Sequence, residues 1–414
     1  RTEFDVPQFQ AGKRATILFD GAMSHANVYI NGQKVGYWPY GYNSFHFDIT
    51  KYLKPGEKNT LAVRLENLPE SSRWYPGAGL YRNVHLIITE DAYIPVWGTY
   101  ITTPSVNEKF AKVNVRTKVV LPEGADPAKY SVETSVWNPN KQKLTAVRTS
   151  LAQMKYNNDL AEQEFVIQDP SLWSPEMPAL YSAETRLYEG DKLKDTYTTP
   201  FGIRSIEIIP DKGFFLNGKR TVFKGVCNHH DLGPLGAAVN DAAIRRQIRI
   251  LKDMGCNAIR TSHNMPAPEL IRACDEMGMM IMAESFDEWN VAKCKNGYNL
   301  LFDEWAEKDL VNLLHNFRNN PSVVMWCIGN EVPNQWNEGD CKIAKWLQDI
   351  CHREDPTRPV TQGMDAPDAV VNNNFAAVMD VAGFNYRPFK YKINYKKLPQ
   401  RIVLGSETAS TVSS

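Results

Sequence analysis

Short runs of alternating apolar and polar residues fill the first 90 positions of the chain. Phe45-His46-Phe47-Asp48-Ile49 alternates as a half-buried strand does, and Ala26-Asn27-Val28-Tyr29-Ile30 leads directly into Asn31-Gly32. An Asn-Gly pair after such a run is typical of a two-residue hairpin turn. The pattern predicts that residues 1–90 form a β-sandwich of jelly-roll type, and its abrupt start suggests that the sandwich is incomplete at its N-terminal side.

Residues 91–205 continue as short strand patterns, at 113–120, 130–137, 164–167 and 183–188, separated by turns rich in Pro, Asn and Gly. About seven strands in roughly 110 residues are typical of an immunoglobulin-like sandwich. The stretch contains no cysteine pair, so we expect no disulfide of the antibody type.

From residue 206 the pattern changes to strands that alternate with helices, which indicates a parallel sheet. The predicted strands are 221–227, 257–260, 279–283, 323–328, 359–361, 381–384 and 402–404. We expect a (β/α)8 TIM barrel over 206–414 whose last strand is missing from this chain, and hence a segment of a longer polypeptide. The predicted fold class is therefore multidomain, α/β plus all-β.

Two of the predicted barrel strands end in a glutamate. The apolar run 323–328 ends in Gly329-Asn330-Glu331, and Ile402-Val403-Leu404 ends in Gly405-Ser406-Glu407. One such glutamate could simply cap a following helix, but two at the carboxyl ends of barrel strands point into one mouth, where these barrels do their chemistry. A protonated and an ionised carboxyl facing each other is the arrangement that hydrolyses a glycosidic bond.

The composition argues against nucleic-acid binding, membrane association and a zinc or redox site. Lys+Arg and Asp+Glu both count 47, so no net charge favours nucleic acid or an anionic membrane as a partner. We find no apolar run near the roughly 20 residues that a transmembrane helix needs. The seven cysteines all lie at or after Cys227 without a C-x-x-C pair, so we expect buried free thiols rather than a zinc or redox site.

Six further motifs extend over nearly the whole chain: Arg73-Trp74-Tyr75-Pro76-Gly77 with Leu80-Tyr81-Arg82, Phe201-Gly202-Ile203-Arg204, Leu216-Asn217-Gly218-Lys219, Asn257-Ala258-Ile259-Arg260-Thr261-Ser262-His263, Asn319-Asn320-Pro321-Ser322 and Gly329-Asn330-Glu331. Together with the order of two sandwiches and a barrel, they resemble glycoside hydrolase family 2, which contains β-galactosidases, β-glucuronidases and β-mannosidases.

The resemblance implies the catalytic roles. Glu331 matches the family's acid/base, Asn330 before it matches the contact to the sugar 2-hydroxyl, and Glu407 matches the nucleophile. Arg260 matches a pocket residue, and its charge would favour the ionised form of Glu407, whose own charge would in turn keep Glu331 protonated. We expect the two carboxyl groups to lie roughly 5–5.5 Å apart, the retaining geometry.

Five other positions are candidates for substrate contact. The resemblance implies that His263 lines the pocket, that Tyr386 lies near the nucleophile and that His229 binds sugar, although either histidine could instead be an ordinary hydrogen-bonded one. Asp287 and Trp289 could bind a sugar hydroxyl and a sugar face, or could equally be loop scaffold.

One departure from the family concerns metal binding. Magnesium-dependent members carry Glu-x-His after the third strand, whereas this chain has Glu288-Trp289-Asn290. An asparagine is a poorer ligand for a hard cation than a carboxylate, so we expect no metal and no cofactor.

These observations predict a retaining exo-β-glycosidase, with β-galactosidase as the preferred activity and a carbohydrate as the partner. β-Glucuronidase, β-mannosidase and an inactive carbohydrate-binding fragment stay open as alternatives. The resemblance favours a periplasmic or secreted location over a cytoplasmic one, and the sequence leaves open whether the chain forms a homo-oligomer.

Overall fold

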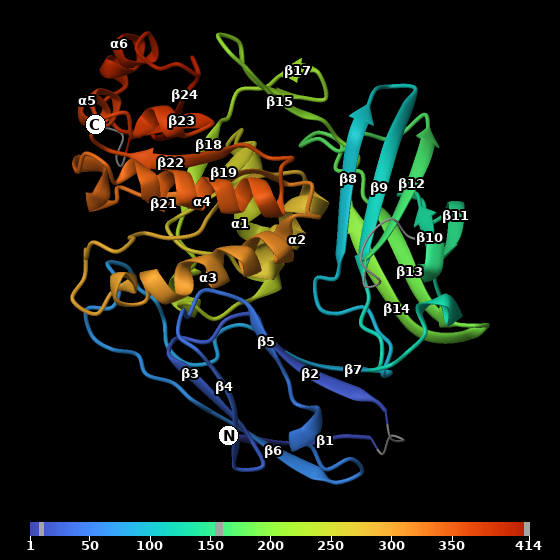
Figure 1. The fold of residues 1–414 in the computed structure, drawn as a ribbon. Coiled ribbons are helices and arrows are strands. Elements are labelled where there is room, and N and C mark those ends of the chain that lie inside the picture. The colour runs from blue at the N-terminus through green and yellow to red at the C-terminus, as the bar shows by residue number, and fades with distance from the viewer. Residues whose placement is uncertain (8–11, 154–159, 410–414) are drawn as a thin grey trace.

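The computed structural model describes residues 1–7, 12–153 and 160–409 (Figure 1). The N-terminal region forms two antiparallel sheets whose alternating strands bury Ile17, Phe19, Val28 and Phe45 between them. In sheet order the strands are β1 (Thr2–Asp5), β6 (Lys58–Arg64), β3 (Ala26–Ile30) and β4 (Gln33–Trp38), and then β5 (Phe45–Asp48), β2 (Arg14–Phe19) and β7 (Val84–Thr89). The expected sandwich is present, and its jelly-roll type stays a prediction.

The middle region is a second sandwich, with seven strands among its described residues, as the turn spacing predicted. One sheet has the order β11 (Lys143–Ser150), β10 (Tyr130–Trp137), β13 (Tyr181–Glu189) and β14 (Lys192–Phe201), and the other β12 (Leu160–Gln168), β9 (Phe110–Lys118) and β8 (Thr99–Val106). Arg204, at the end of this region, donates hydrogen bonds to the carbonyls of Pro321 (2.7 Å) and Val323 (2.8 Å), which fixes the sandwich to the start of a barrel strand.

The C-terminal region contains seven parallel strands that are neighbours in chain order. They are β18 (Gly225–Asn228), β19 (Ala258–Thr261), β20 (Met280–Glu284), β21 (Val323–Asn330), β22 (Val360–Met364), β23 (Val381–Asn385) and β24 (Val403–Glu407). The intervening helices are α1 (Asp241–Asp253), α2 (Pro268–Met277), α3 (Phe302–Phe317), α4 (Cys341–Glu354), α5 (Pro367–Asn372) and α6 (Tyr391–Tyr395). Within the described ranges, none of the helices is long and apolar enough to cross a membrane.

A small antiparallel sheet precedes the barrel strands. It consists of β15 (Ile206–Ile209), β16 (Gly213–Leu216) and β17 (Lys219–Arg220). Its apolar side chain Ile208 packs with Met325 and Val381, so this sheet covers the barrel at the end where its strands begin.

The N-terminal sandwich lies against the barrel helices (Figure 1). Asp309 of α3 is fully buried and accepts hydrogen bonds from Trp38 Nε1 (2.9 Å), Asn43 Nδ2 (2.7 Å) and the Tyr298 hydroxyl (2.6 Å). Arg82, also buried, donates to the carbonyl of Met265 at 2.8 Å. These contacts hold the loop that joins β6 to β7 next to the carboxyl ends of the barrel strands.

Candidate active site

Glu331 and Glu407 come together at the carboxyl ends of two barrel strands. Glu331 directly follows β21, whose eight residues are all buried, and Glu407 is the last residue of β24. The side-chain amide of Asn385, at the end of β23, donates to both: its Nδ2 lies 3.0 Å from Glu331 Oε1 and 2.6 Å from Glu407 Oε2. Because both oxygens contact the same nitrogen, the distance between them cannot exceed the sum of these two hydrogen-bond lengths. That limit on the oxygen–oxygen distance favours the retaining spacing of about 5–5.5 Å over the spacing of about 6.5–9.5 Å in inverting glycosidases.

Two residues of this site have an unusual backbone conformation. Glu331 has φ 43° and Tyr386 has φ 57°, both in the left-handed region that non-glycine residues seldom occupy. Such strained residues gather at functional sites, where the surrounding structure has to hold them. Tyr386 is held by its own N–H, which donates to the backbone carbonyl of Glu407 at 2.5 Å.

A buried charge network stands behind Glu407. Arg260, at 4% exposure, is 2.5 Å from Glu284 Oε2 through Nε and 3.5 Å from Glu407 Oε2 through Nη1. His263 bridges the same two acids, with Nδ1 2.8 Å from Glu284 and Nε2 3.8 Å from Glu407. Glu284 therefore sets the position of both groups that face the candidate nucleophile.

The cations of this network only partly offset the effect of burial on the pKa of Glu407. Burial raises the pKa of the Glu407 carboxyl above its usual value, the charge of Arg260 lowers it, and the charge of Glu331 raises it further. We expected Arg260 to hold this pKa low. Arg260 does lower it, but burial has the larger effect, so the pKa is raised overall. Burial lowers the pKa of Arg260, but the acidic groups around it, with Glu284 contributing most, together outweigh burial and hold this pKa well above its usual value, so the guanidinium stays charged.

Asn330 is oriented from both sides. Its Nδ2 donates to Asp287 at 3.0 Å, and its Oδ1 accepts from Arg260 Nη2 at 3.0 Å. Asp287 also accepts a bidentate pair from Arg73 (2.9 and 2.7 Å) and a bond from Lys293 Nζ at 3.0 Å. Burial raises the pKa of Asp287, but these two cations outweigh it and hold the pKa well below its usual range. Asp287 is thus a bound anion that supports Asn330, which favours the scaffold alternative for this residue.

A cavity of about 710 Å³ opens beside Glu407 and is lined by Trp74, His229, Arg260 and Tyr386 as well. The ring of His229 packs on Trp74 with centroids 4.3 Å apart and meets His263 edge-on at 5.3 Å. Burial lowers the pKa of His229, so the neutral form of this imidazole is favoured. Burial and the charges of Glu407 and Glu331 raise the pKa of Tyr386 to about 12, so its hydroxyl keeps its proton.

Comparisons with known proteins agree with this geometry. Residues 1–90 match the description "Glycosyl hydrolases family 2, sugar binding domain", residues 93–204 match "Glycosyl hydrolases family 2", and residues 207–409 match "Glycosyl hydrolases family 2, TIM barrel domain". The chain belongs to glycoside hydrolase family 2.

The similar family 2 proteins are longer than this chain. A β-galactosidase, BoGH2A, of Bacteroides ovatus is 40% identical over 93% of this chain and 49% of the relative, and a putative β-glucuronidase of Formosa agariphila is 35% identical over 93% and 35%. A solved family 2 structure from Bacteroides cellulosilyticus has a TM-score of 0.93 at 36% identity, covering 99% of this chain and 53% of that one. The chain therefore spans between about a third and about half of the length of these relatives.

An aromatic and an acidic residue of the loop after β20, Trp289 and Glu288, lie away from the cavity. Trp289 is 0% exposed and packs on Phe375, and its Nε1 donates to the carbonyl of Ile328 at 2.8 Å. It offers no face to a sugar, so the expected sugar-stacking role is corrected to barrel core. Glu288 accepts backbone N–H groups of Lys293 (2.6 Å) and Asn299 (3.1 Å), which organises the loop.

Three residues of this family 2 site, Glu284, Asn385 and Trp74, were not predicted from the sequence. Glu284 ends the apolar strand β20 just as Glu407 ends β24, so the same signal marks it, although the sequence offered no role for it. Asn385 directly precedes Tyr386 at a strand end, and its side-chain role depends on two distant glutamates. Trp74 lies in another domain, where no local pattern connects it to the barrel.

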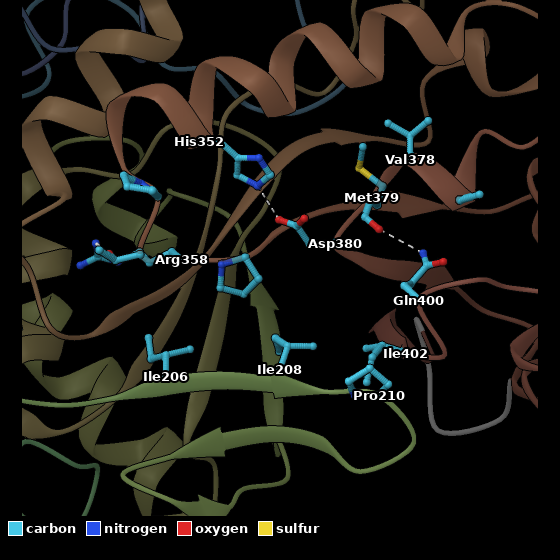
Figure 2. Close-up of a pocket in the computed structure, with 14 residues that line it drawn as sticks. Ile206, Ile208, Pro210, His352, Arg358, Val378, Met379, Asp380, Gln400 and Ile402 are labelled. Atoms are coloured by element: carbon cyan, nitrogen blue, oxygen red, sulfur yellow. Dashed lines mark hydrogen bonds and ion pairs between the residues drawn. The ribbon is translucent and has the colours of Figure 1, made fainter. Parts of the chain in front are cut away.

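A second cavity, of about 610 Å³, lies where the barrel strands begin (Figure 2). His352 Nε2 is 2.8 Å from Asp380 Oδ2, and the same oxygen accepts the N–H of Val360 at 2.8 Å. The ion pair thus ties a helix to two barrel strands. Chemistry in these barrels occurs at the opposite end, and this end serves stability, so we assign the pair a structural role.

Proposed function

We propose that the intact gene product is a retaining, exo-acting β-glycosidase that cleaves terminal β-galactosides. The observation that carries the proposal is the single amide of Asn385 in contact with both Glu331 and Glu407, because only closely spaced carboxyls can share one donor. Homologous proteins named as β-galactosidase and β-glucuronidase support the reaction class.

In the proposed first step, Glu407 attacks the anomeric carbon while Glu331 protonates the leaving oxygen. The new bond is an ester between the sugar and Glu407, and the bond to the leaving group breaks. In the second step, Glu331 removes a proton from water, which displaces the sugar from Glu407. Esterification removes the negative charge of Glu407, and Glu331 then serves as the base for this second step.

The cations near the cavity favour a neutral sugar. Among the described lining residues the cations are Arg260 and Lys224; Arg260 is paired with Glu284, and Lys224 precedes β18 at the other end of the barrel. Arg73 is paired with Asp287. A sugar carboxylate would find no unpaired guanidinium among them, which supports a β-galactoside over a β-glucuronide.

The test is a panel of nitrophenyl β-glycosides assayed with the intact gene product. We expect the galactoside to have the highest kcat/KM; dominant turnover of the glucuronide or mannoside would reject the substrate choice. Glu407→Gln should abolish turnover, and Glu331→Ala should be partly rescued by azide with an activated leaving group. The control is Glu338→Gln, an exposed glutamate of the loop after Glu331, which should keep full activity.

Two outcomes would overturn the mechanism itself. Full activity of Glu407→Gln would show that this carboxylate is not the nucleophile. Sugar binding without hydrolysis by the wild-type protein would favour the inactive carbohydrate-binding alternative.

A further inference from the structure

The N-terminal sandwich reaches the catalytic cavity through Trp74. The loop between β6 and β7 places its indole against the rings of His229 (4.3 Å between centroids) and His263 (5.5 Å), two groups of the barrel. Trp74 lines the same cavity as Glu407. A residue of a separate domain is therefore part of the wall next to the candidate nucleophile.

Two polar atoms of this wall lack a partner within the described part of the chain. Trp74 Nε1 and His229 Nδ1 are both buried, and neither makes a hydrogen bond there. Buried indole N–H groups usually find an acceptor because an unpaired buried donor is unfavourable. Orphan polar atoms beside a cavity are accordingly what a polar ligand would satisfy.

The loop that carries Trp74 is clamped in place. The Arg73 guanidinium lies 4.9 Å from the centre of the Trp74 ring and forms its bidentate pair with Asp287. Asp287 in turn holds Asn330, the residue before Glu331. By contrast, Tyr75 on the same loop is 87% exposed. Trp74 is thus held in the same network as the catalytic pair, and Tyr75 lies outside it.

We propose that Trp74 determines specificity by donating its indole N–H to a hydroxyl oxygen of the terminal sugar. The ligand class is a neutral hexopyranoside with a free hydroxyl at the position facing the indole. This inference rests on the proposed function, since it assumes that the sugar cleaved by Glu407 occupies this cavity. If Trp74 makes this contact, the N-terminal sandwich is part of the active site. Removing the indole N–H from the protein and removing the hydroxyl from the sugar should then reduce kcat/KM in the same way.

The test combines Trp74→Phe, which keeps a ring but removes the N–H, with a series of monodeoxy nitrophenyl galactosides. A site that hydrogen-bonds a substrate hydroxyl discriminates against its loss, so we expect kcat/KM of Trp74→Phe to fall about 10- to 100-fold on the parent galactoside. On one deoxy form, wild type and variant should agree within about twofold, as a double-mutant cycle requires for a direct contact. Tyr75→Phe is the matched control and should behave as wild type.

An equal loss on every deoxy form, or no loss on the parent, would overturn the inference. A binding measurement tests the inference without relying on turnover. In the Glu407→Gln background, Trp74→Phe should weaken galactoside binding about tenfold. Unchanged binding would also overturn the inference. Failure of the proposed function has a different signature, because the wild-type protein would then hydrolyse no glycoside. Far-ultraviolet circular dichroism of each variant separates misfolding from loss of the contact.

Discussion

Replacing Glu284 by glutamine tests how much of the site depends on one buried charge. Glu284 is 0% exposed, forms an ion pair with Arg260 at 2.5 Å and is hydrogen-bonded to His263 at 2.8 Å. Glutamine keeps the size of the side chain and one acceptor oxygen but removes the negative charge. Arg260 then stays buried with Glu407, 3.5 Å away, as its main counter-charge.

Breaking a buried ion pair by neutralising one partner costs about 3–5 kcal/mol, because the other charge is left without compensation. The acceptor oxygen that the glutamine side chain retains, and the pair of Arg260 with Glu407, place the expected loss near the lower limit, about 3 kcal/mol. For a domain of 150–250 residues, each kcal/mol lowers the melting temperature by about 2–4 °C. We therefore expect the barrel transition of Glu284→Gln to fall by roughly 6–12 °C.

The same substitution should change the pH dependence of catalysis. Burial is the main cause that raises the pKa of Glu407, and the charge of Glu284 adds to it. Removing that charge lowers the pKa of the nucleophile, so the acidic limb of the kcat/KM profile should move to lower pH. At the same time kcat should fall, because Arg260 and His263 lose the anchor that positions them.

The assays are differential scanning calorimetry and pH–rate profiles of the wild type and Glu284→Gln. Glu276→Gln is the control, since Glu276 is 38% exposed in a surface pair with Arg245 and such pairs contribute about 0–1 kcal/mol. A melting temperature within about 1 °C of the wild type, together with an unmoved acidic limb, would refute the reasoning.

Two further predictions concern the contacts between domains. Burial raises the pKa of Asp309 to about 7, so its folded form holds a proton that the unfolded chain releases near pH 4, and stability should fall between about pH 4 and pH 7 by a few kcal/mol. Asp309→Asn should remove this fall; urea midpoints at pH 5 and pH 8 that differ as in wild type would contradict it. Gly278 has φ 74° and a Cβ there would overlap the carbonyl oxygen of Pro175, so Gly278→Ala should destabilise by at least about 1–2 kcal/mol, and an unchanged denaturation midpoint would contradict the prediction.

The barrel strands and the two glutamates at their ends could be predicted because their signals are local. An apolar run that ends in a glutamate is visible in β21 and β24 without knowledge of the partners. The same signal also marks β20, which ends in Glu284. What separates Glu284 from Glu407 is its complete burial between Arg260 and His263, a tertiary contact that no run of residues shows.

The remaining site residues depend on long-range contacts in the same way. Trp289 and Trp74 are both tryptophans of loops near the catalytic mouth, yet the first is sealed in the barrel core and the second lines the cavity. The role of Asp287 as scaffold is decided by Arg73, more than 200 positions earlier in the chain. Sequence distance therefore hides the part of the site that the N-terminal sandwich supplies.

The group that bridges Glu331 and Glu407 is a neutral amide, and this matters for the proposed proton transfer. A lysine at this position would favour the ionised form of both carboxyls and so oppose an acid at Glu331. Asn385 instead offers a donor without charge, and the Ser406 hydroxyl, which donates to Asn385 Oδ1 at 2.8 Å, keeps the amide nitrogen turned toward the glutamates. That nitrogen lies 2.6 Å from Glu407 Oε2 and 3.0 Å from both Glu331 Oε1 and Asn330 Oδ1, so its two hydrogens are shared among three acceptors and the shortest contact is to Glu407. For the proposed mechanism, this amide would stabilise the ionised form of Glu407 without placing a positive charge beside Glu331.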